Sequence, residues 1–364
     1  MVVPFIPEPS TDDPSWGARG EPPMSWIRRS TLEDAVRIRA FLNGAMDRLP
    51  EAAHRSIGPR LDSHWQAALF ELVVGRTLQE LGATLEYETE IESGKHVDWL
   101  ATFPDGQVGI EATVPLINAS AGQILREQEP ALALIEDLTP HGWTVVVVAV
   151  PAISANASRR PVRAVLERWI DRLADVDPSR EAEYREDGLS GGTLHLIFRP
   201  VPGDPAIQAE PGGTFFDDSE ERIRSAVERK KAQVSGAPWP VLLAVQGSAL
   251  ATDLGDYDQA LLGRTVQAVN RDLVTTGVHF EATGVFGESR PEPPTLAGVL
   301  AFAEVSPTAA SEPVLYPHPR SLVPLPEDIL ALAQHRFGGQ GIEEVAASSM
   351  AVMGRLGLAS PVWQ

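Results

Sequence analysis

Residues 96–115, HVDWLATFPDGQVGIEATVP, carry the pattern that most restricts the fold of this chain. Two runs alternate apolar and polar side chains, and the PDGQ between them is typical of a turn. Successive side chains of a strand point to opposite faces of a sheet. If the two runs pair as a hairpin, Asp98 and Glu111 therefore share a face and lie close together, opposite the face of Trp99 and Ile110.

Two carboxylates on one face repel each other unless something positive lies between them. Asp98 and Glu111, with an exposed strand carbonyl, form the hard-oxygen site that Mg²⁺ or a similar ion prefers. The alternative is a half-solvated sheet whose wet face happens to carry acids. The hairpin alone does not decide between the two.

A third carboxylate lies in an apolar setting. Glu71 belongs to a predicted helix, SHWQAALFELVVGRTLQELG, over residues 63–82. Burying a lone carboxylate is costly unless it is paired, protonated or bound to a metal. Glu71 is thus a member of the acidic site, or it caps a neighbour or pairs with an arginine, for which Arg76 is a candidate. Its neighbours one helical turn away are small or apolar: Ala67, Ala68, Val74 and Gly75.

Lysine is rare in this chain. Three of the 30 basic residues are lysines, namely Lys95, Lys230 and Lys231. Lysine can give up its proton, whereas arginine effectively cannot, so a lysine can mark a place where arginine would not serve. Lys230 falls in the middle of the apolar stripe of the helix predicted over residues 218–235, and Lys231 falls on its flank. The alternative is a buried stem with the ammonium in water.

Composition restricts the class of protein. The formal net charge of −20 argues against a broad basic surface that coats nucleic acid, but it allows a local basic cleft. The absence of cysteine excludes disulfides and thiolate metal sites. Neither a signal peptide nor a membrane span is evident, so we expect a cytoplasmic protein without a membrane partner.

The remaining segments alternate between strands and helices, which predicts an α/β fold with a mixed sheet sandwiched by helices. We expect a flexible arm over residues 1–30, a core over 31–250, a C-terminal extension packed on the core over 251–337 and a tail over 338–364. Further helices are expected at 30–49, 119–138, 161–175 and 326–337, and further strands at 84–91, 143–150, 192–200 and 240–247.

The order of these elements resembles the restriction-endonuclease-like, or PD-(D/E)XK, nuclease superfamily. The resemblance rests on Glu71 in LFELVVG, Asp98 in HVDWL and Glu111 in GIEATVP. It covers residues 60–115 with the motif and extends more weakly to about residue 330. Stretches there are similar to uncharacterised bacterial proteins of this type, which carry VEAT in the third motif strand.

The resemblance implies that Asp98, Glu111 and Glu71 hold Mg²⁺ or Mn²⁺, and that a lysine positions or activates the attacking water. This sequence departs from the superfamily pattern at Thr113, where that lysine should stand, and at Val97, where a proline is usual. Either the lysine has migrated, with Lys230 the first candidate and Lys231 and Lys95 behind it, or catalysis has been lost.

Three functions remain open at this point. The first is a metal-dependent nuclease, acting on DNA and serving in defence against foreign nucleic acid. The second is an inactive descendant of the same fold that binds a protein partner as a scaffold. The third is a hydrolase of a small phosphorylated substrate. A basic path for nucleic acid would have to come from six arginines, whose simpler reading is solvated helix faces: Arg159, Arg160, Arg163, Arg222, Arg224 and Arg229.

Overall fold

The computed structural model divides the chain into two compact units, residues 1–116 with 218–364, and residues 117–217. Each is described by itself. The described residues are 4–15, 17, 21–115, 119–140, 142–153, 157–177, 179–189, 192–200, 207–208, 219–247, 252–269, 275–287, 296–306, 309–338, 341–348 and 351–358.

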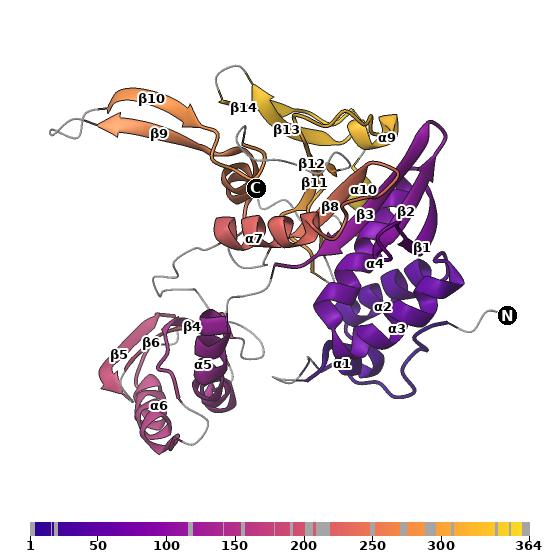
Figure 1. The fold of residues 1–364 in the computed structure, drawn as a ribbon. Helices are drawn as coiled ribbons and strands as arrows, with labels where there is room; N and C mark the ends of the chain where they lie inside the picture. The colour runs from indigo at the N-terminus through magenta and orange to yellow at the C-terminus, as the bar shows by residue number, and fades with distance from the viewer. Residues whose placement is uncertain are drawn as a thin grey trace. The chain divides into compact units, whose positions relative to one another are not determined.

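The larger unit begins with four helices and a three-stranded antiparallel meander. The helices are α1 (Pro23–Arg29), α2 (Glu33–Met46), α3 (Glu51–Ser63) and α4 (Trp65–Glu80), and the strands are β1 (Thr84–Glu90), β2 (His96–Phe103) and β3 (Gly106–Thr113). Figure 1 shows these helices gathered beside the three strands. The predicted hairpin is present, with Trp99 opposite Ile110 and Leu100 opposite Gly109.

The chain returns to this unit after residue 217 and completes a mixed sheet of eight strands. The later elements are α7 (Ser219–Lys231), β8 (Val241–Gln246), α8 (Leu254–Tyr257), the π-helix η1 (Asp258–Leu262), β9 (Arg264–Val269), β10 (Thr275–Glu281), β11 (Leu296–Phe302), β12 (Val314–Pro317), α9 (Glu327–Leu330), β13 (Ala333–Gly338), β14 (Gly341–Val345) and α10 (Val352–Arg355). The strand order is β1-β2-β3-β8-β11-β12-β13-β14, and β8 pairs in parallel with both β3 and β11. Strands β9 and β10 form a separate two-stranded ribbon (Figure 1).

Helices cover both faces of the eight-stranded sheet. One hydrophobic cluster joins Phe70 and Leu78 of α4 to Trp99, Ile110 and Leu242. The other joins Ile223 and Val227 of α7 to Leu243 and Val245. Leu242 and Leu243 are neighbours in β8 but belong to different clusters, because their side chains point to opposite faces of the sheet. The sheet therefore has an α4 face and an α7 face, as the sequence predicts for an α/β sandwich.

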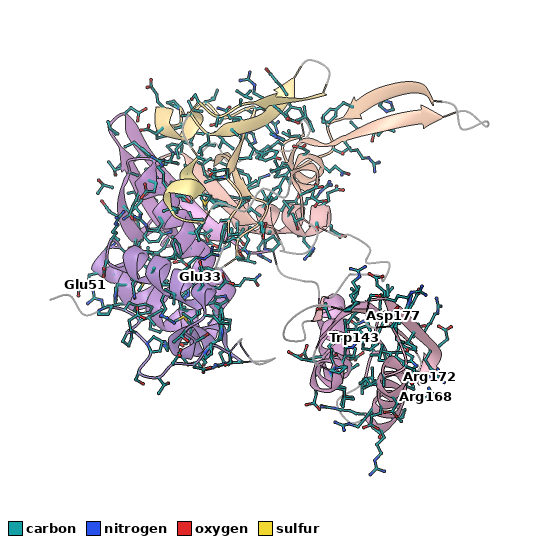
Figure 2. The ribbon with its side chains drawn as sticks, turned by 180° about the vertical axis from the view of Figure 1, so that it is seen from behind. Glu33, Glu51, Trp143, Arg168, Arg172 and Asp177 are labelled. Carbon is teal, nitrogen blue, oxygen red and sulfur yellow. The ribbon has the colours of Figure 1, made fainter. Side chains whose placement is uncertain are left out.

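The smaller unit has its own core and a four-stranded sheet of order β5-β6-β4-β7. Its elements are α5 (Ala119–Leu138), β4 (Trp143–Ala149), α6 (Arg160–Leu173), β5 (Ala182–Leu189), β6 (Gly192–Pro200) and β7 (Ile207–Gln208). In β4, Val145 and Val146 are both fully buried, so both faces of this apolar strand are covered. Figure 2 shows the side chains of Arg168 and Arg172 on α6.

The structure differs from the predicted division into a core over 31–250 and an extension over 251–337. Residues 117–217, placed in the core by the sequence, bury their apolar side chains among themselves. The region after residue 250, by contrast, supplies strands β11 to β14 to the main sheet.

The two ends of the chain also differ from the flexible arm and the tail that the sequence predicts. Met24 and Ile27 of α1 are completely buried, so the last part of the arm packs into the core. Near the other end, Val352 and Met353 of α10 are buried as well. None of the described helices is both long and apolar enough to cross a bilayer.

Candidate active site

Asp98 of β2 is paired with neither of the neighbouring strands, β1 and β3. The pairing of β2 with β3 ends at Trp99 opposite Ile110. The pairing of β2 with β1 passes from Trp99 opposite Tyr87 to Val97 opposite Thr89, and skips Asp98. The residue across from Asp98 in β1 is Glu88, whose φ of 51° is unusual for a residue with a side chain. The local backbone thus frees Asp98 from regular strand pairing.

The Asp98 side chain takes the place of the missing ladder bond. The backbone N–H of Ala112 donates to Asp98 Oδ2 at 2.7 Å. Ala112 follows Glu111 in β3, so this bond ties the two acidic positions together across the separating strands. Asp98 is partly buried, and Glu111 is only 2% exposed.

Trp99 anchors the strand beside Asp98. Its indole Nε1 donates to the backbone carbonyl of Glu71 at 3.0 Å, and its ring packs on Gly75 of α4. A Cβ on Gly75 would lie 2.7 Å from the Trp99 ring, so the close approach of α4 to β2 depends on this glycine. The alternation of Asp98 and Trp99 therefore places the acid on one face and its anchor on the other.

Lys230 of α7 reaches Glu111. Its Nζ donates a hydrogen bond to Glu111 Oε1. Glu111 lies opposite Leu243 of β8 in the parallel pairing, and Leu243 belongs to the cluster that packs against α7. The side chain of Thr113, two residues further along β3, points to the same face as Glu111. Lys230 thus approaches Glu111 from the helix that covers this face of the sheet.

Gln233 completes a triangle that sequence reasoning missed. Its Nε2 donates to Glu111 Oε1 at 3.0 Å, while its Oε1 accepts from Lys230 Nζ at 3.2 Å. An amide can serve both charges because it carries a donor and an acceptor. The only signal in the sequence was the spacing Lys230-x-x-Gln233, which puts the two side chains on one side of a helix end.

Glu71 is buried near the other two acids, but both of its oxygens are occupied. The Tyr87 hydroxyl donates to Glu71 Oε1 at 2.6 Å, and Arg60 Nη2 lies 2.8 Å from Oε2. The sequence suggested Arg76 as its partner, which was wrong, since Arg76 pairs with Glu80 at 2.8 Å. Arg76 lies five residues along the same helix, on another side of it.

The charges of the three carboxylates act on one another. Burial, together with the negative charges of Glu111 and Glu71, raises the pKa of Asp98 well above its usual range. Burial also raises the pKa of Glu111, although the ammonium of Lys230 opposes the shift. Shifts of this kind, in acids held beside a lysine, are typical of functional sites as well as of buried ion-pair networks.

The other two lysines lie outside this group. Lys95 is exposed, and its Nζ donates to the carbonyl of Ala232 at 3.1 Å. The charge of Lys231 acts instead on His318, whose pKa is lowered to about 4 by burial, by Arg320 and by Lys231.

The residues present fit a hard divalent cation at Asp98 and Glu111. Glu111 Oε2 is buried and accepts no hydrogen bond from the described residues, and an unpaired buried carboxylate oxygen is costly unless a cation meets it. The predicted set of three carboxylates is not assembled, because in the described part of the chain no three Asp, Glu, His or Cys side chains are arranged to hold a metal. The arrangement therefore offers two carboxylates, with Glu71 held apart by Tyr87 and Arg60.

The six arginines of the candidate basic path are divided between the two units. Arg159, Arg160 and Arg163 belong to the smaller unit, where Arg163 pairs with Asp137 at 3.3 Å. In α7, Arg224 pairs with Glu220, and Arg229 is exposed.

No family model matches the chain, and no curated protein or solved structure is significantly similar to it.

Proposed function

We propose that this protein is a metal-dependent phosphodiester hydrolase, a nuclease related to the PD-(D/E)XK superfamily. The observation that carries the proposal is the contact of Lys230 with Glu111 on the strand next to Asp98. Two acids and a lysine from distant segments meet where two strands separate, and each was expected at the site from the sequence.

In this proposal Asp98 and Glu111 hold Mg²⁺ or Mn²⁺. The bound cation neutralises the negative charge that develops during phosphodiester cleavage. The chain holds Asp98 ready through the Ala112 amide, and it holds Glu111 through Gln233 and Lys230. Occupation of the site requires both carboxyl groups to lose their protons, so activity rises with pH.

Lys230 has two roles in this proposal. Its ammonium donates to the phosphoryl oxygens or orients the attacking water, and such fixed charges are worth most in a site that excludes water. Trp239 helps to exclude water from the site. Its indole packs on Gly109, which lies two positions before Glu111 on the same face of β3. A Cβ on Gly109 would lie 2.3 Å from Trp239 Nε1, so the glycine admits the ring.

The test is cleavage of supercoiled plasmid, linear DNA and RNA by the full chain with Mg²⁺ or Mn²⁺, and with EDTA as the control. The matched variants are Glu111→Gln and Asp98→Asn, which keep the shape of each side chain. The proposal predicts metal-dependent cleavage that both variants lose while their circular dichroism spectra stay native. Cleavage that survives both substitutions would contradict it.

One observation favours a second function, an inactive nuclease fold that serves as a scaffold. Lys230 already neutralises Glu111, so the pair is satisfied in part without any metal. Isothermal titration with Mn²⁺ separates the two functions. Heat of binding that disappears in Asp98→Asn supports the hydrolase, whereas no binding up to millimolar Mn²⁺ supports the scaffold.

A further inference from the structure

Arg60 of α3 lies beside the acidic site and is held from two sides. Its Nη2 is 2.8 Å from Glu71 Oε2, and its Nη1 donates to the Tyr87 hydroxyl at 3.4 Å. Tyr87 in turn donates to the other oxygen of Glu71. The helix α3, the helix α4 and the strand β1 therefore converge on one guanidinium.

The side chain of Arg60 is partly exposed to solvent. The Arg60 side chain is 35% exposed, whereas Glu71 beneath it is 4% exposed. A guanidinium carries five N–H groups in a planar fork, and the contacts with Glu71 and Tyr87 use two of them. Arg60 is thus fixed by Glu71 and Tyr87 while its side chain keeps partial contact with solvent, and three of its five N–H groups are not used by these two contacts.

The charge of Arg60 reaches the acids. Burial works against its charged form, but the hydrogen bond and charge of Glu71, with smaller contributions from Tyr87 and Asp98, leave the pKa of Arg60 above its usual value. Two of the three acids have a cationic partner: Glu111 pairs with Lys230 of α7, and Glu71 pairs with Arg60 of α3. An anionic substrate that approaches the acids is repelled unless such cations receive it.

We propose that Arg60 binds a backbone phosphate of the nucleic acid at the rim of the site, and that Glu71 and Tyr87 position it. This inference rests on the proposed function, since it names a contact of the same substrate. Arginine suits the task, because its fork matches two phosphate oxygens at once. Glu71 then acts through Arg60 and is not a ligand of the metal.

The experiment measures binding without cleavage. Fluorescence anisotropy of a labelled DNA duplex and of its single strand is followed in Ca²⁺ at several salt concentrations. Arg60→Gln is expected to weaken binding about tenfold and to lower the slope of log affinity against log salt by about one for the duplex. The control is Arg55→Gln on the same helix, because Arg55 is 72% exposed and, among the described residues, forms its ion pair with Glu51, whose side chain is labelled in Figure 2.

Arg60→Gln leaves the buried carboxylate of Glu71 without its cation, which destabilises the fold. A second variant therefore controls for misfolding. The double variant Arg60→Gln/Glu71→Gln removes both charges together and is expected to bind as weakly as the single variant. Arg60→Lys, which keeps the charge but loses the fork, is expected to fall between the single variant and the wild type.

The outcomes separate this inference from the proposed function. Wild-type binding and an unchanged salt slope in Arg60→Gln or in the double variant would overturn the inference, even if the protein cleaves DNA. Weakened binding in these variants supports the inference, even if the wild type cleaves nothing. A wild type that binds neither duplex nor single strand would overturn it as well.

Discussion

Lys230 donates a hydrogen bond to Glu111, although 119 residues separate the two in the chain. The smaller unit lies in the interval between them in sequence, so the fold brings the two side chains together across an inserted body of about a hundred residues. A lysine on the helix α7 thereby reaches an acid on the strand β3.

Lys230→Met is the most direct test of the role of this lysine. Removal of one preorganised charge from a catalytic site typically lowers kcat by roughly 10²- to 10³-fold, and we expect a loss of that size. Lys95→Met is the control, because Lys95 is exposed and contacts only the Ala232 carbonyl among the groups described. Equal activity of the two variants in single-turnover cleavage would remove Lys230 from the mechanism.

Gln233→Leu tests the bridge between Lys230 and Glu111. The amide contributes two hydrogen bonds, and a net hydrogen bond is worth about 0.5–1.5 kcal/mol, so loss of both is expected to lower kcat by roughly 5- to 150-fold. The pH–rate profile of the variant should also move to higher pH, since the hydrogen bond from Gln233 lowers the pKa of Glu111. A lower melting temperature with unchanged kcat and pH profile would reduce Gln233 to a structural residue.

Local sequence patterns predicted several side-chain placements, but they did not predict the division of the chain into two units. Strand alternation was sufficient to place Asp98 and Glu111 on one face, and helical periodicity was sufficient to bring Lys230 to the sheet. The partner of Glu71 could not be predicted, because Arg60 lies on another helix and is brought close by tertiary packing. The inserted unit was missed because β4 is as apolar as a strand of the main sheet.

Local patterns also failed towards the C-terminus. The helix expected over 326–337 is a short helix, α9, followed by the strand β13. The stretch contains apolar residues at helical spacing, but pairing of β13 with β12 and β14 outweighs that preference. The pairing with β12, which lies earlier in the chain, leaves no signal within residues 326–337.

Asp98→Asn should change how stability depends on pH. The raised pKa of Asp98 means that the folded, metal-free protein retains a proton that the unfolded chain has already released. The retained proton therefore stabilises the folded protein fully at pH values below the pKa of Asp98 in the unfolded chain. This stabilisation is lost as the pH rises towards the pKa of Asp98 in the folded protein. We expect Asp98→Asn to be more stable than the wild type at pH 8 in EDTA, and the advantage to shrink as the pH falls towards 4.

Urea unfolding at several pH values measures this difference directly. Addition of Mn²⁺ at pH 8 should raise the stability of the wild type and leave Asp98→Asn unchanged, because the cation favours the ionised site. A difference between the two proteins that is the same at every pH would show that Asp98 titrates normally.

Gly75→Ala probes the approach of α4 to the strand that carries Asp98. The new methyl group would meet the Trp99 ring, and overpacking of this kind costs about 1–3 kcal/mol, partly offset by the better helix propensity of alanine. The matched control is Gly44→Ala in α2, where no atom lies within 4 Å of the new Cβ and a gain of about 0.5–1 kcal/mol is expected. Chemical denaturation of both variants checks the contrast, and a Gly75→Ala protein as stable as Gly44→Ala would contradict the packing described.

The central claim is that Asp98, Glu111 and Lys230 form one metal-dependent hydrolytic site. Its most direct measurement is single-turnover cleavage of a labelled DNA by wild type and Glu111→Gln, each with Mn²⁺ and with EDTA. The account predicts cleavage only by the wild type with Mn²⁺. Equal cleavage by folded Glu111→Gln, or cleavage by the wild type that persists in EDTA, would contradict it.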